Sequence, residues 1–101
     1  MTFTVGKVYT FKLNSGEEVV AKVTAAPHQA TYIEVSEPVS IAPSPQGMGL
    51  VPSMFTADPS LPVTINTSCV SMYALTEDSV NMKYLEATTG IKVPDKKIIM
   101  G

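Results

Sequence analysis

The chain has 101 residues, of which 45% are hydrophobic and 16% are charged, and its net charge is −2. This length fits one domain, so we expect residues 1–101 to form a single domain. All seven basic residues are Lys, and Arg is the residue best suited to bidentate contacts with phosphate and guanine. The composition therefore argues against a nucleic-acid-binding protein that depends on a broad basic face.

The charged fraction is well below the roughly 25% of an average domain, and the mean hydropathy is +0.18. The simplest interpretation is that part of the apolar surface is buried between copies of the chain. The alternative is a well-packed monomer with few charges on its surface.

Several classes of site and location are disfavoured by the residues themselves. Cys69 is the single cysteine, so it provides neither an intramolecular disulfide nor a Cys-based zinc site, and we expect it to be a buried thiol. We expect no metal and no cofactor. The first residues, MTFTVGKVYTF, do not resemble a signal peptide, and no apolar run approaches the roughly 20 residues of a membrane span. We therefore expect a cytoplasmic protein with no membrane contact.

The first two strands are predicted from alternating apolar residues. Val8–Leu13 and Val19–Thr24 alternate with a period of two, and Asn14-Ser15-Gly16 is a turn sequence between them. We predict a hairpin in which Leu13 lies opposite Val19, Phe11 opposite Ala21 and Tyr9 opposite Val23.

The middle of the chain predicts further short strands separated by breakers. Thr31–Val35 is the third strand, with a weaker continuation to Val39–Ile41, and Pro43–Gly47 is a loop. Met48–Phe55 is apolar but contains Pro52, which indicates an edge strand, a bulged strand or an irregular segment. Two more strands, Val63–Asn66 and Cys69–Ala74, are expected on either side of Thr67-Ser68.

A single helix is expected after the strands, at residues 76–90. Thr76 is a suitable N-cap, Glu77 and Asp78 suit the positive end of the helix dipole, and Gly90 suits the position after its last turn. The tail, residues 91–101, ends in Ile98, Ile99 and Met100, which we expect to dock on this subunit or on a neighbour. The predicted fold class is mostly β: a small, strongly bent, five-stranded barrel at residues 7–74, followed by a C-terminal helix.

Two stretches of this pattern resemble the Sm-like (LSm) family of ring proteins. Leu13-Asn14-Ser15-Gly16 is similar to the Leu-x-x-Gly turn of that family and is followed by apolar Val19, Val20 and Val23 at the family's spacing. Ile65–Met72 is similar to the family's short closing motif. The segments GEEVVAKV (residues 16–23) and GLVPSMF (residues 49–55) resemble the Sm-like proteins encoded by marine phages. The resemblance implies an Sm-like barrel, a homo-oligomeric ring of about five to seven subunits, and binding of single-stranded RNA or DNA near the pore.

The residues that bind RNA in the family are largely replaced in this chain. The Asp and Asn of the loop after the second strand fall on Pro27 and Thr31, the base-stacking position falls on Gln29, and Asn66-Thr67 stands where the family has Arg-Gly. Polar and aromatic groups remain that can hydrogen-bond to or stack on a base. The candidate nucleic-acid-binding residues are His28, Gln29, Thr31, Tyr32, Asn66 and Thr67. Because no cationic clamp accompanies them, we expect weak binding.

The same residues give little sign of catalysis. His28 has no paired acid or nucleophile in its motif, and no phosphate loop or metal cluster is evident, so we expect no catalytic residues and no enzyme. The six Met residues are expected to fill the core and interfaces. The alternative function is a phage structural or host-protein interaction module that keeps the ring and has lost RNA recognition.

Overall fold

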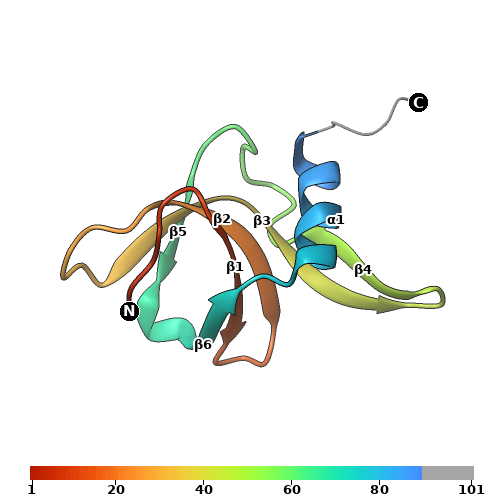
Figure 1. Cartoon of the computed structure of the whole chain (residues 1–101), viewed down its shortest axis with the longest axis horizontal. Coiled ribbons are helices and arrows are strands. Elements are labelled where there is room, and N and C mark those ends of the chain that lie inside the picture. Colours follow the sequence, from red (N-terminus) through yellow and green to blue (C-terminus); the bar gives the residue numbers. More distant parts are fainter. Residues whose placement is uncertain (90–101) are drawn as a thin grey trace.

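Six strands form one antiparallel sheet, and a helix follows it, in the computed structural model, which describes residues 1–89. The sheet order is β4-β3-β2-β1-β6, and β5 pairs with β3. In chain order the elements are β1 (Val8–Leu13), β2 (Glu18–Ala25), β3 (Tyr32–Ser44), β4 (Gly47–Pro52), β5 (Val63–Asn66), the 3₁₀ turn η1 (Thr67–Cys69), β6 (Val70–Leu75) and α1 (Asp78–Thr89). The mostly β, strongly bent sheet with a helix after it is confirmed, with six strands rather than five (Figure 1).

The β1–β2 hairpin has the predicted faces but a different register. Phe11 lies opposite Val19 and Tyr9 opposite Ala21, so the predicted register is wrong by two residues. The reason is the turn: the Gly16 N–H donates to the Leu13 carbonyl at 2.9 Å, and Gly16 has φ 94°, a left-handed conformation that Gly adopts without steric cost. A shift of two residues leaves the same side chains facing the core, which is why the pattern alone did not reveal it.

Strand β3 is continuous for 13 residues and has three partners. It pairs with β2 on one side, while on the other its first half pairs with β5 and its second half with β4. Opposite β2, Val20 pairs with Val39 and Lys22 with Ser36, so Glu37 and Pro38 form a bulge against Ala21. The loop 53–62 leaves the sheet between β4 and β5, on the other side of the same bulge.

Several local predictions are corrected. The loop predicted at Pro43–Gly47 is only a tight turn at residues 45–46, because β3 runs to Ser44 and pairs there with Gly47 of β4. β4 lies at the end of the sheet, which is one of the three alternatives that Pro52 left open, and it ends at Pro52 rather than at Phe55. Cys69 is exposed and lies in η1, so the expectation of a buried thiol is wrong. The described methionines are also exposed rather than in the core: Met1, Met48, Met54, Met72 and Met82.

The core has two parts, one on each face of the sheet. Inside the bent sheet lie Tyr9, Phe11, Ala21, Val23, Ile33, Val35 and Val70. On the other face, Val20 and Val39 pack against Tyr84 of α1. Adjacent residues such as Val19 and Val20 are therefore both buried, because the helix covers the face that would otherwise meet water.

The helix is fastened to the sheet through the side chain of Tyr84, which is only 2% exposed. Its hydroxyl donates to the Ser36 carbonyl at 2.8 Å and accepts from the Lys22 N–H at 3.2 Å. These two backbone groups flank the β3 bulge, so the phenol bridges the gap that the bulge makes in the β2–β3 ladder.

The helix begins two residues later than predicted. The first helical hydrogen bond runs from the Asn81 N–H to the Glu77 carbonyl at 2.9 Å, so Glu77 and not Thr76 holds the N-cap position. The Thr76 hydroxyl is instead 2.9 Å from that of Thr10 on β1. The expected role of Gly90 and the docking of residues 91–101 fall outside the described residues. Within residues 1–89, no helix has the length and apolar character needed to cross a membrane.

Replacing Tyr84 with Phe should destabilise the fold by about 1–3 kcal/mol, because the Lys22 N–H and the Ser36 carbonyl lose their partner while the ring packing remains. Urea unfolding followed by circular dichroism measures the change. The matched control is Tyr32→Phe, which removes a hydroxyl from an exposed residue and should change stability by less than about 0.5 kcal/mol. Equal effects of the two substitutions would contradict the bridging role.

Alkaline pH should remove part of the stability that Tyr84 provides. Burial raises the pKa of Tyr84 above its ordinary value of 10.0. In the unfolded chain this phenol ionises near that ordinary value, while in the fold it stays protonated to higher pH. The unfolded state therefore loses its proton first, and stability falls as the pH rises above 10.0. The free-energy difference between the wild type and Tyr84→Phe should shrink over this range, and a constant difference would contradict the effect.

Candidate functional site

The loop between β2 and β3 carries three of the predicted binding residues. Its centre is a turn in which the Ala30 N–H donates to the Pro27 carbonyl at 3.2 Å. Gln29, in the third position of the turn, has φ 60°, the left-handed conformation that residues other than Gly rarely adopt. His28, Gln29 and Thr31 are all exposed, so the turn presents their side chains to solvent.

Hydrogen bonds join this loop to the start of η1, far along the chain. The Thr31 carbonyl accepts from both the N–H and the side-chain hydroxyl of Thr67, each at 3.0 Å. One residue further, Tyr32 pairs with Asn66 across β3 and β5. The structure therefore brings together all six predicted residues, which come from two segments separated by more than 30 positions.

A surface hollow of about 440 Å³ lies beside this junction. Four of the predicted residues line it: His28, Gln29, Tyr32 and Thr67. Thr31 and Asn66 are adjacent in sequence to lining residues but do not line the hollow. The Asn66 side chain is exposed and makes no capping bond to η1, so its amide remains available to a ligand.

The other wall of the hollow is the N-terminal arm, which the sequence analysis missed. Phe3 lies in the aromatic cluster of the core, with its ring centroid 4.5 Å from that of Tyr73 and 5.1 Å from that of Tyr9. The Thr2 and Thr4 N–H groups donate to the hydroxyls of these same two tyrosines, each at 2.9 Å. The alternation of Phe3 and Val5 with Thr2 and Thr4 was the available signal, but it was too short to distinguish an ordered arm from a loose end.

The hollow is polar, and charged side chains contribute little to its described lining. None of the described residues that line it is Lys, Asp or Glu. Amide, hydroxyl and imidazole groups can exchange hydrogen bonds with the edge of a nucleobase, and the exposed ring of Tyr32 offers a surface for stacking. The geometry thus suits an uncharged planar ligand better than a phosphate.

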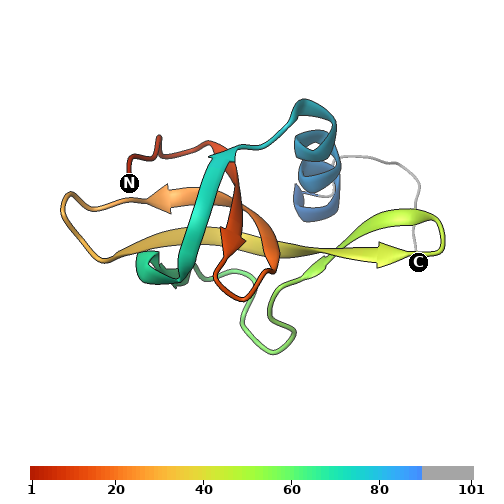
Figure 2. The same cartoon turned by 90° about the horizontal axis from the view of Figure 1, so that it is seen from below.

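The site lies at one end of the molecule. The N-terminus, the β2–β3 loop and η1 gather at the left of Figure 1, whereas α1 and the β3–β4 hairpin lie at the right. Figure 2, turned by 90°, shows the same separation. A ligand at this end would leave the helix and the β3–β4 hairpin free for other contacts.

The described residues contain no group of three or more His, Cys, Asp or Glu side chains placed to hold a metal ion. Comparison of the chain with protein-family models and with curated proteins finds no match.

Proposed function

We propose that this chain is a subunit of an Sm-like homo-oligomeric ring that binds unpaired bases of single-stranded RNA at the hollow. The observation that carries the proposal is the convergence of the β2–β3 loop with the β5–η1 junction. These are the two segments to which the family resemblance assigns base recognition, and the Thr31–Thr67 hydrogen bonds join them.

The binding that we propose is directed at bases rather than at phosphates. Tyr32 would stack on a base, while Gln29, Asn66 and Thr67 would hydrogen-bond to its edge, with His28 and Thr31 beside them. Since none of the described residues that line the hollow is Lys, few counterions would be released on binding. We therefore expect weak affinity with a shallow dependence on salt, in the cytoplasm of the cell or of the phage host.

The ring is supported by the two ends of the described sheet. β6 and β4 lie at opposite ends of the strand order, and each presents exposed apolar side chains: Met72 and Leu75 on β6, Met48 and Val51 on β4. An edge strand with apolar neighbours favours pairing with another chain. A head-to-tail contact of two different edges closes into a ring when its rotation permits.

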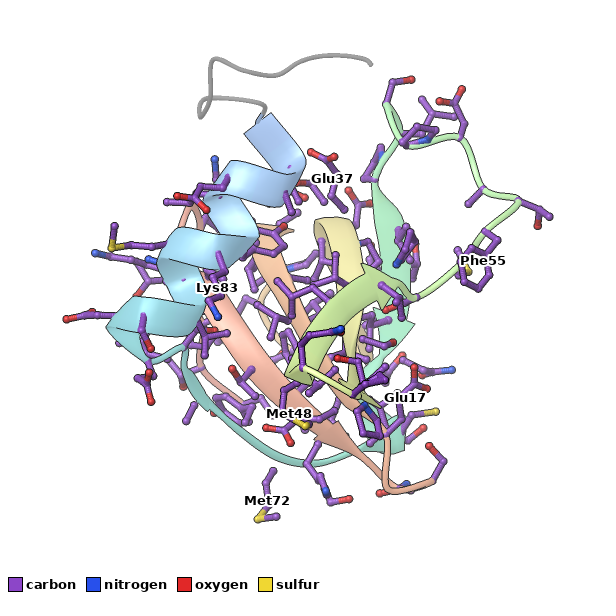
Figure 3. All side chains as sticks on the ribbon, turned by 90° about the vertical axis from the view of Figure 1, so that its right-hand side faces the viewer. Glu17, Glu37, Met48, Phe55, Met72 and Lys83 are labelled. Atoms are coloured by element: carbon purple, nitrogen blue, oxygen red, sulfur yellow. The ribbon has the colours of Figure 1, made fainter. Side chains whose placement is uncertain are left out.

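A second candidate function is an interaction module, phage structural or host-directed, that keeps the ring without RNA recognition. The absence of Lys among the described residues lining the hollow favours it. So do the exposed Met54, Phe55 and Leu61 of the loop 53–62, which do not line the hollow and offer apolar contacts to a protein. Phe55 is labelled on this loop in Figure 3.

RNA binding is tested by fluorescence anisotropy with labelled oligo-U and oligo-A at two salt concentrations. The wild type should bind at low salt, and the double variant Gln29→Gly with Asn66→Ala should lose most of the affinity. Gly is chosen at position 29 because it accepts the φ of 60° without strain, so the loop keeps its shape.

The matched control is Gln46→Gly, in the exposed β3–β4 turn at the other end of the molecule, which should bind like the wild type. No binding by the wild type at low salt would remove the RNA role. An unchanged activity of the double variant in the protein's biological setting would favour the interaction module.

The ring is tested by light scattering on matched methionine variants. Met72 on β6 and Met82 on α1 are each 63% exposed. Met72→Lys places a charge at the proposed subunit contact and should lower the oligomer's mass, whereas Met82→Lys should leave it unchanged. A monomeric wild type would contradict the ring. Equal oligomer masses for the two variants would show that the subunit contact does not involve β6.

A further inference from the structure

A second hollow, of about 230 Å³, shares no lining residue with the hollow at the proposed RNA site. Its walls are the end of α1, the β3 bulge with β4, and the loop 53–62, which Figure 3 shows facing one another across it. The lining is mostly apolar, with Leu50 from β4 and Met54 and Leu61 from the loop. We call this hollow the helix–loop groove.

The ionisable side chains among the described residues of the groove are both acidic, Glu37 and Asp58. Glu37 is held by the β3 bulge at φ 47°, between the end of α1 and the loop (Figure 3). Asp58 accepts hydrogen bonds from the Ser60 N–H and hydroxyl, which lower its pKa below 3.8 and keep it ionised at neutral pH. An occupant of this groove should therefore combine apolar side chains with positive charge.

The chain itself contains a segment with that chemistry, directly after the helix. Residues 90–101 lie outside the described residues, and only their sequence enters here. They include five large apolar residues and three Lys against one Asp: Ile91, Val93, Ile98, Ile99 and Met100, with Lys92, Lys96, Lys97 and Asp95. Exposure of so many apolar side chains to water is unfavourable, so we expect this segment to bind a surface.

Only a short stretch of chain separates the groove from the apolar residues of the C-terminal segment. Ala87 and Thr88, in the last turn of α1, line the groove, so the chain leaves the helix at the groove's edge. The nine steps from Thr89 to Ile98 can span up to about 30 Å when extended. A short tether also raises the effective concentration of the segment at the groove far above that of any separate molecule.

We propose that the helix–loop groove binds the chain's own C-terminal segment, residues 91–100. The apolar side chains fill the hollow beside Leu50, Met54 and Leu61, and the lysines lie toward Glu37 and Asp58. The attachment is within one chain, and it is independent of the proposed RNA site and of the ring.

The test uses a single tryptophan as a reporter, because the chain has no Trp. In full-length Ile99→Trp the emission should lie at shorter wavelength than in a free peptide of residues 91–101 with the same substitution. Its quenching by acrylamide should be several-fold slower than in the peptide. Neither quantity should change with protein concentration, since the contact is intramolecular.

Groove variants in the Ile99→Trp background locate the contact. Leu61 is 58% exposed, so Leu61→Asp should leave the fold intact while placing a carboxylate in the groove. We expect it to restore peptide-like emission and quenching. Leu75→Asp, at a residue 62% exposed on β6, is the matched control and should keep the reporter protected. Lys96→Glu with Lys97→Glu should weaken the protection.

Each other outcome overturns the proposal. Peptide-like emission in the full-length protein means that the groove is left to a foreign partner. Protection that grows with concentration, or that Leu75→Asp removes, means that the segment binds a neighbouring copy. Protection that survives Leu61→Asp, with the far-ultraviolet circular dichroism spectrum unchanged, places the segment elsewhere on the chain.

Discussion

The bulge in β3 at Glu37 and Pro38 is the constraint on which the rest of the structure depends. A bulge leaves ladder groups unpaired, and Pro38 has no N–H with which to repair the ladder. The Tyr84 hydroxyl satisfies two of these backbone groups, because it accepts from the Lys22 N–H and donates to the Ser36 carbonyl. Because the bridging group comes from α1, the helix completes the sheet rather than merely covering it, and its position is fixed by hydrogen bonds as well as by apolar contact.

The same bulge divides β3 into two halves that contribute to different surfaces. The first half pairs with β5 and carries Tyr32 to the polar hollow, while the second half pairs with β4 and forms one side of the helix–loop groove. The loop 53–62 lies opposite the bulge and connects β4 to β5, the strands that pair with the two halves of β3. One backbone feature therefore lies between a polar hollow and an apolar, acidic groove that share no lining residue.

The sequence predicted what depends on local periodicity and missed what depends on distant partners. Alternation identified the strand faces, and Pro52 left an edge strand as one of three alternatives for β4. The hairpin register escaped it, because a shift of two residues leaves the faces unchanged. The Tyr84 bridge joins residues 48 and 62 positions apart, for which the sequence has no local signal. At the site, the convergence of Gln29 and Thr67 followed from the resemblance, whereas the wall made by Phe3 did not.

A site with few charged side chains and a ring of identical subunits complement each other in the proposed function. Because none of the described residues that line the hollow is Lys, the hollow provides base contacts but little electrostatic attraction, so one site alone would hold a base only briefly. In a ring, a strand long enough to enter several hollows gains affinity from effective concentration without any added charge. A monomer with this hollow would lack that gain, so the proposed RNA role depends on the edges of β4 and β6 as much as on Gln29 and Asn66.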